Sequence, residues 1–137
     1  MKQEITYKTF DHIKSSSELF YNFLVWTSEF EFIEIELNFL KHLIKTYPFQ
    51  SKIPNLYEHL QLFIQELDNL EKIKSNLIDK IHTQNIQLSN KLKQYEMNSD
   101  NFYRIEYEKI SEEIFNYMQN YKNLKVRIFE YVNGLID

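Results

Sequence analysis

Cysteine is absent from this chain of 137 residues, glycine occurs once and proline twice. Without cysteine there is no disulfide, no thiolate zinc site and no cysteine nucleophile. The single glycine, Gly134, lies near the end of the sequence and excludes a glycine-rich loop that cradles a phosphate. These absences remove several familiar kinds of active site.

Long apolar runs are lacking as well. No stretch approaches the roughly 18 apolar residues that a membrane-spanning helix needs. The first residues, MKQEITYKTFDHIK, contain no apolar core of the length found in a signal peptide. We therefore expect a cytoplasmic protein with no membrane partner.

Alanine is missing and arginine occurs only as Arg104 and Arg127, whereas lysine, asparagine, isoleucine, tyrosine and phenylalanine are abundant. Most codons of the depleted residues are GC-rich, and those of the enriched residues are AT-rich. This bias indicates a low-GC, bacterial genome. It accounts for part of the aromatic content, so the ten tyrosines do not by themselves indicate a binding surface.

Charges of both signs are interspersed along the chain, and the net charge is −4. A nucleic-acid-binding protein usually gathers lysine and arginine on one face. The lysines here are scattered among acidic residues, and we interpret the pairs Lys72/Lys74 and Lys91/Lys93 as parts of solvated helix faces. We expect no nucleic-acid partner.

Three long segments lie between the residues that interrupt helices. Pro48 and Pro54 bracket the first break, the polar cluster 98–101 forms the second, and Gly134 closes the last segment. We predict helices over about 16–47, 55–96 and 101–133. A chain of this length can form one domain with its own core.

The first segment contains EFEFIEIEL at 29–37, where acidic and apolar residues nearly alternate as in a strand. A longer pattern decides against a strand, because apolar residues recur in strict 4-3 steps over 29 residues. This first stripe consists of Leu19, Phe23, Trp26, Phe30, Ile33, Leu37, Leu40, Ile44 and Tyr47. We therefore predict a helix, on which Trp26 belongs to the core.

The other two segments show the same spacing. The stripe of the second segment consists of Leu56, Leu60, Phe63, Leu67, Leu70, Leu77, Ile81, Leu88 and Tyr95, and Lys74, Gln84 and Lys91 interrupt it. The stripe of the third consists of Ile110, Ile114, Tyr117, Tyr121, Leu124, Ile128, Tyr131 and Leu135. Sustained 3.5-residue spacing predicts helices that pack as in a coiled coil.

Capping signals mark the expected helix ends. Ser15 with Glu18, and Asn55 with Glu58, have the spacing of an N-cap and its third helical residue. Asn133-Gly134 has the composition of a C-cap.

Short connections between long helices favour antiparallel neighbours. We therefore predict an all-α fold, an antiparallel up-down-up three-helix bundle over residues 15–137. Residues 1–14 contain four spaced apolar residues and are expected to form an N-terminal arm or a short extra helix.

A second apolar band lies outside the first stripe of the first helix. It consists of Val25, Phe32, Ile35, Phe39 and Leu43, and we call it the outer band. Because a three-helix bundle buries one broad face per helix, the band has no obvious partner within the monomer. A homo-oligomer contact or the helix of another protein would explain it best, since large apolar patches usually mark contact sites.

Two other interpretations of the outer band stay open. The first helix would sit centrally in the bundle with the N-terminal arm over the band, or the apolar residues would simply reflect codon bias and remain exposed.

Metal binding is a weaker hypothesis. Bundles that hold two iron or manganese ions use repeated Glu-x-x-His motifs, which this chain lacks. Antiparallel pairing is expected to bring Glu36 level with Glu66, with Glu130 and His59 as the other available ligands. Pairing of Glu36 and Glu66 with Arg127 or a lysine explains the same carboxylates better.

Other chemistry finds little support. The sequence contains no strand-turn-helix motif that would present a nucleophile. A small-ligand site is conceivable, because Tyr117, Tyr121 and Tyr131 could line a slot in the core. We therefore expect a non-enzymatic protein-protein interaction module without a cofactor, which self-associates or binds another helical protein. A metal- or small-ligand-binding bundle is the alternative.

Overall fold

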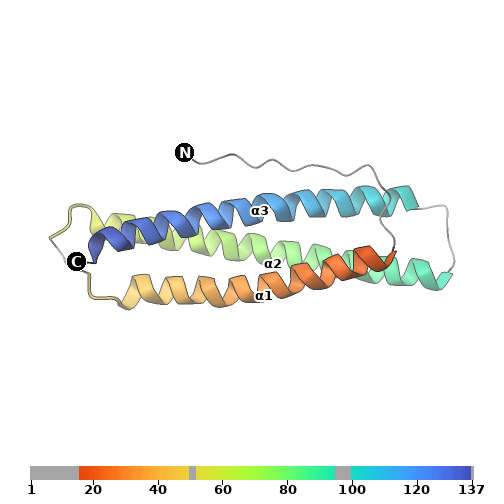
Figure 1. The fold of residues 1–137 in the computed structure, drawn as a ribbon, viewed down its shortest axis with the longest axis horizontal. Helices are drawn as coiled ribbons and strands as arrows, with labels where there is room; N and C mark the ends of the chain where they lie inside the picture. Colours follow the sequence, from red (N-terminus) through yellow and green to blue (C-terminus); the bar gives the residue numbers. More distant parts are fainter. Residues whose placement is uncertain (1–15, 50–51, 95–99, 137) are drawn as a thin grey trace.

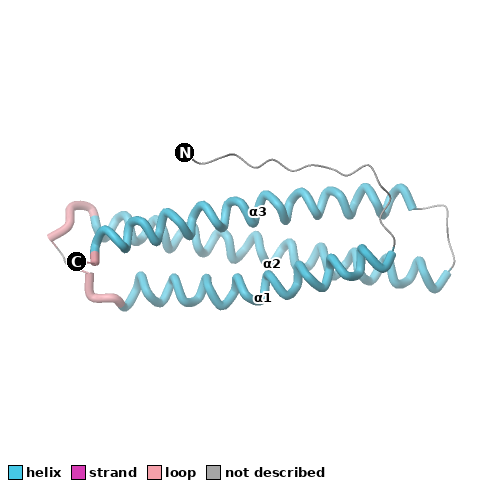
Figure 2. The backbone as a smooth tube through the Cα atoms, viewed as in Figure 1, coloured by secondary structure: helices cyan, strands magenta, loops and turns pink. Residues whose placement is uncertain are grey.

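A computed structural model describes residues 16–49, 52–94 and 100–136. Three helices make up nearly all of them: α1 (Ser16–Thr46), α2 (Leu56–Gln94) and α3 (Asp100–Leu135). The same residues contain no strand (Figure 2). The all-α prediction is therefore confirmed, and EFEFIEIEL lies within α1.

The helices form an elongated antiparallel bundle in which α2 returns alongside α1 and α3 runs in the same direction as α1 (Figure 1). The closest backbone approaches join α2 to α1 and α2 to α3. Side chains also join α1 to α3, as in the stacked rings of Trp26 and Tyr107, so each helix contacts both others. The arm proposed for residues 1–14 lies outside the described residues.

The core follows the predicted stripes. In α1 the side chains from Leu19 to Ile44 on the first stripe are buried, except that Trp26 is partly buried and packs against the core. The buried apolar residues are Leu19, Phe23, Phe30, Ile33, Leu37, Leu40, Ile44, Leu67, Leu70, Leu77, Ile81, Leu88, Tyr107, Ile110, Ile114, Tyr117, Tyr121, Leu124, Ile128 and Val132. Burial of each large apolar side chain stabilises the fold by about 1.5–3 kcal/mol.

The stripes depart from prediction near the helix ends. Tyr47 follows the last residue of α1 and is exposed, with its ring against Phe49 at a centroid distance of 4.6 Å. Tyr107 and Val132 are buried although neither was assigned to the stripe of α3. The side chain of Tyr95 lies outside the described residues.

Two polar side chains occupy the core stripe of α2. Lys74 is only 3% exposed and Gln84 only 6%. The interpretation of Lys74 as part of a solvated face is therefore wrong, because position 74 continues the 4-3 core stripe of α2 between the buried Leu70 and Leu77. The Lys74 ammonium lies 3.8 Å from a carboxylate oxygen of the exposed Glu34.

The start of α2 is confirmed at Asn55, whose carbonyl accepts a hydrogen bond from the His59 amide at 3.0 Å. Asn55 has a positive φ of 58°, which asparagine adopts more readily than most residues. The predicted cap at Asn133-Gly134 is wrong, because α3 continues to Leu135 and Gly134 has no positive φ. Ser15 is outside the described residues.

Candidate interaction surface on the first helix

The outer band faces away from the bundle core. Phe32 is 58% exposed, Ile35 68% and Phe39 59%. Val25 and Leu43 at its two ends are partly exposed. Since these residues follow one another at helical spacing, the exposed rings and the isoleucine form one face of α1.

The apolar face extends further toward the start of α1 than the sequence analysis predicted. Tyr21 and Leu24 are 66% and 71% exposed. Positions 21, 25, 28, 32, 35 and 39 follow the same 4-3 spacing as the core stripe. Ser28 is the one polar residue in this series, and Tyr21 continues the band by one further step of four residues.

Glu36 lies between the outer band and the core stripe, where it joins α1 to α3. Its carboxylate accepts hydrogen bonds from the Tyr121 hydroxyl and the Lys125 ammonium. Partial burial alone would raise the pKa of Glu36, but the hydrogen bonds and the charge of Lys125 outweigh it and lower that pKa. Burial and the nearby Glu36 carboxylate raise the pKa of Tyr121.

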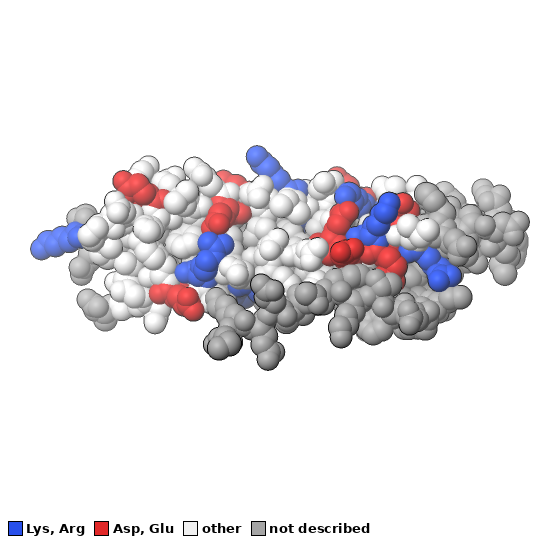
Figure 3. All heavy atoms as spheres, turned by 90° about the horizontal axis from the view of Figure 1, so that it is seen from above, with Lys and Arg blue, Asp and Glu red and all other residues white. Residues whose placement is uncertain are grey.

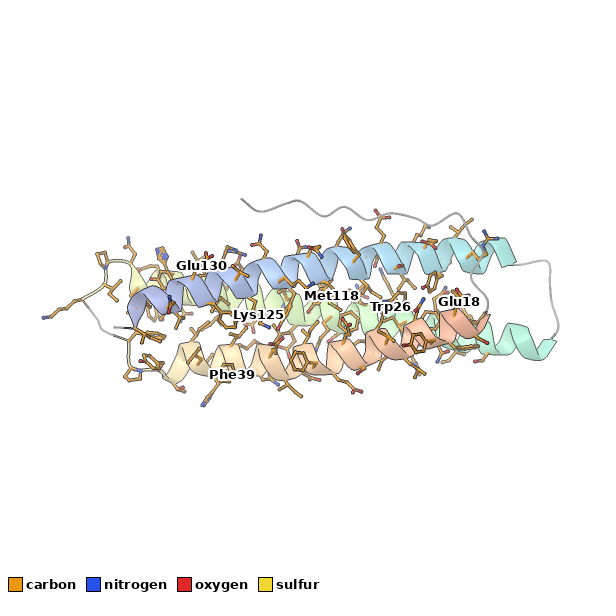
Figure 4. The ribbon with its side chains drawn as sticks, in the orientation of Figure 1. Glu18, Trp26, Phe39, Met118, Lys125 and Glu130 are labelled. Atoms are coloured by element: carbon orange, nitrogen blue, oxygen red, sulfur yellow. The ribbon has the colours of Figure 1, made fainter. Side chains whose placement is uncertain are left out.

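Lys125 also brings an exposed aromatic ring of α3 close to this edge of the band. Its ammonium lies 5.8 Å from the ring centroid of Phe129, which is 45% exposed. Figure 4 shows Lys125 between α1 and α3, on the same half of the bundle as Phe39. The apolar surface near Phe39 is thus bordered by a charged pair and then by a second apolar side chain.

Lys41 holds α1 against α2. Its ammonium forms ion pairs with Asp68, at 2.7 Å, and with Glu71. Burial would lower the pKa of Lys41, but these two carboxylates raise it, and the hydrogen bond from Lys41 lowers the pKa of Asp68. This clamp fixes α1 so that the outer band points outward.

The metal-ligand candidates do not come together. Glu36 binds Lys125, whereas Glu66 forms an ion pair with Arg127 at 3.2 Å, as the alternative interpretation predicted. The imidazole of His59 stacks on Tyr131 at 5.1 Å, and Glu130 is exposed on the side of α3 farther from α1 (Figure 4). Within the described ranges no three His, Asp and Glu side chains are grouped closely enough to hold a metal ion.

The prediction that Glu36 and Glu66 lie at the same height along the bundle axis is also wrong. Lys41 pairs with Asp68 and Glu71, and α1 and α2 are antiparallel. Glu36 therefore lies level with a part of α2 beyond Glu71, well away from Glu66.

Two of the three tyrosines proposed to line a ligand slot, Tyr117 and Tyr121, donate their hydroxyls to other groups of the bundle. The Tyr117 hydroxyl donates to the Leu70 carbonyl at 3.0 Å, and burial raises the pKa of Tyr117. The Tyr131 hydroxyl is buried without a hydrogen-bond partner among the residues that the structure describes. The clefts found lie elsewhere, one beside the α1–α2 turn and one of about 500 Å³ between α1 and α2 near His82.

The charged surface is mixed. On the face seen in Figure 3, acidic and basic side chains alternate and neither sign forms an extended patch. No helix of the described part of the chain is long and apolar enough to cross a membrane.

Comparisons with known proteins returned no matching family model, no matching curated protein and no matching solved structure.

Proposed function

We propose that this chain is a non-enzymatic helical-bundle interaction module that self-associates through the outer band of α1. The observation that supports the proposal most strongly is the exposure of Phe32, Ile35 and Phe39 by 58–68% on one helix face. Single exposed apolar residues are common on protein surfaces. A continuous row of them is typical of a contact site.

The energetics favour a contact of this kind. Burying an exposed phenylalanine or isoleucine side chain gains about 1.5–3 kcal/mol. In a symmetric dimer each residue of the band is buried twice, once in each copy. Several such side chains therefore offset the loss of translational and rotational freedom that association costs, about 4–15 kcal/mol.

The proposal is tested with the F32E/F39E double variant, since a carboxylate is costly to bury without a partner. The unmodified chain is expected to sediment as a dimer or larger species and to show that mass in native mass spectrometry. The F32E/F39E variant is expected to sediment as a monomer with unchanged helical circular dichroism.

A matched control is the Y57E/L62E variant, which places the same substitution on apolar α2 residues that are 71% and 58% exposed. It is expected to keep the oligomeric state of the unmodified chain. A monomeric unmodified chain, or an F32E/F39E variant that stays oligomeric, would overturn self-association through the band. Loss of helical signal in the F32E/F39E variant alone would make the band part of the monomer core.

A further inference from the structure

Charge is distributed unevenly along α1. All of its acidic residues, Glu18, Glu29, Glu31, Glu34 and Glu36, precede all of its basic ones, Lys41, His42 and Lys45. The first two-thirds of the helix is therefore negative and the last third positive. The helix macrodipole, positive at the N-terminus and negative at the C-terminus, opposes this asymmetry of side-chain charge, and only near the two ends.

The charges that border the outer band bear on how a second copy would be oriented. Glu31, Asn38 and Lys45 are exposed and seven residues apart, so they share one edge of the band in a helix that follows 3.5-residue spacing. Glu29 and Glu36, also seven apart, lie along the other edge. One edge thus changes sign along its length, and the other carries acidic residues.

A parallel dimer would bring opposite edges of the two bands together at the same height. Glu31 of one copy would then approach the Glu29 and Glu36 edge of the other, and like charges in such positions are unfavourable. In an antiparallel dimer each edge of the band lies beside the same edge of the other copy, which runs in the opposite direction. On the edge that contains Glu31 and Lys45, the acidic end of one copy then lies beside the basic end of the other.

On the basis of the self-association proposed above, we infer that two copies dock their α1 helices antiparallel, with Glu31 of each copy beside Lys45 of the other. The twofold axis passes near Asn38, which meets its own copy. In this register Ile35 packs against Phe39 of the other copy, so two apolar side chains that are 68% and 59% exposed lie at the centre of the contact. Glu36, next to the axis on the other edge, is neutralised by Lys125 within its own chain.

Cross-linking distinguishes the two orientations, and the absence of cysteine allows single cysteines to be placed without background. Ser28 and Thr46 are exposed, follow the spacing of the band and are 18 residues, or roughly 27 Å, apart along α1. In the antiparallel dimer neither S28C nor T46C is expected to cross-link alone with a short bis-maleimide. Their mixture is expected to give the S28C–T46C product.

The reverse pattern would overturn the antiparallel arrangement: S28C and T46C would each cross-link alone, and the mixed product would not exceed the statistical amount. This failure is distinct from failure of the proposed function. If the F32E/F39E substitutions dissociate the dimer but the cysteines cross-link in the parallel pattern, only the antiparallel orientation is overturned. If the unmodified chain is monomeric, both the orientation and the proposed self-association are overturned.

A charge exchange provides an independent test. E31K and K45E are each expected to weaken dimerisation by roughly five- to tenfold, because each places like charges together at two symmetric positions. The E31K/K45E double variant is expected to return the dimer Kd to within about twofold of its original value. The control K72E, at an exposed lysine of α2, is expected to leave the Kd unchanged. Additive weakening in the double variant would overturn the pairing of Glu31 with Lys45.

Discussion

α1 and α2 pack along each other and both expose apolar side chains, yet within the described residues α2 also buries polar side chains in its core stripe and α1 does not. α1 exposes Phe32, Ile35 and Phe39 in addition to a fully apolar core stripe, while α2 buries Lys74 and Gln84 within its own. Both helices contact the other two helices of the bundle, α1 through pairs such as Glu36 with Lys125 and Lys41 with Asp68. The chemical character of a side chain alone therefore does not tell whether its position on the helix is buried.

The sharpest way to test this comparison is to truncate one residue on each face of α1. Leu37 is 1% exposed and Ile35 is 68% exposed, two positions along the same helix. In the F32E/F39E background, Leu37→Ala is expected to lower the free energy of unfolding by about 2–5 kcal/mol, because it leaves a cavity. Ile35→Ala is expected to change it by less than about 0.5 kcal/mol.

Urea unfolding followed by circular dichroism measures both effects. Similar losses at the two positions would mean that Ile35 belongs to the monomer core, and the contrast between the faces of α1 would no longer hold.

A smaller effect is expected inside α2. Lys74→Met removes a charge from the bundle interior and keeps a long side chain, whereas the exposed Glu34 stays hydrated without its partner. Replacing a buried charge by an apolar group of similar size is often neutral or stabilising. We expect the free energy of unfolding to rise by about 1 kcal/mol, again measured in urea.

The variant Lys72→Met, at an exposed neighbouring lysine, is the control and is expected to leave stability within about 0.5 kcal/mol. A loss of stability in Lys74→Met alone would instead show that the 3.8 Å pair with Glu34 stabilises the bundle.

The smallest effect concerns Glu36, on the border between the two faces of α1. Because its folded-state pKa is lowered, the carboxylate stabilises the fold above its unfolded-state pKa, and this contribution is lost as the pH falls through the folded-state value. Glu36→Gln is expected to cost about 0.5 kcal/mol at neutral pH, because solvent screens this partly exposed pair. The difference from the unmodified chain is expected to disappear in acid.

Thermal unfolding at neutral and at acidic pH measures this dependence, with Glu112→Gln at an exposed position of α3 as the control. A difference between Glu36→Gln and the unmodified chain that is the same at both pH values would contradict the link between the carboxylate and Lys125.

The sequence predicted the three helices and most of the core because 3.5-residue spacing is a local property that each segment displays by itself. It also predicted the pairing of Glu66 with Arg127, which the structure shows at 3.2 Å. Lys74 stands on the 4-3 stripe of α2, so the spacing marked its position correctly; the prediction of a solvated face was wrong because it followed the charge of the side chain instead of its position.

The offset of each helix along the bundle axis relative to its neighbours could not be predicted from the sequence either. Glu36 meets Lys125, which is 89 positions away in the chain. That contact depends on how far each helix slides along its neighbour, and the slide is set by the turns and by clamps such as Lys41 with Asp68. The outer band could be predicted because only the periodicity of α1 is needed to define it. The Glu36–Lys125 pair beside the band could not, because that pair depends on how α1 and α3 pack.

The up-down-up order has a mechanical consequence. Ser16 at the start of α1 and Leu135 at the end of α3 lie at opposite ends of the bundle (Figure 1). A tensile load applied between them therefore acts along the helix axes and shears many side-chain contacts at once, instead of peeling one helix away turn by turn.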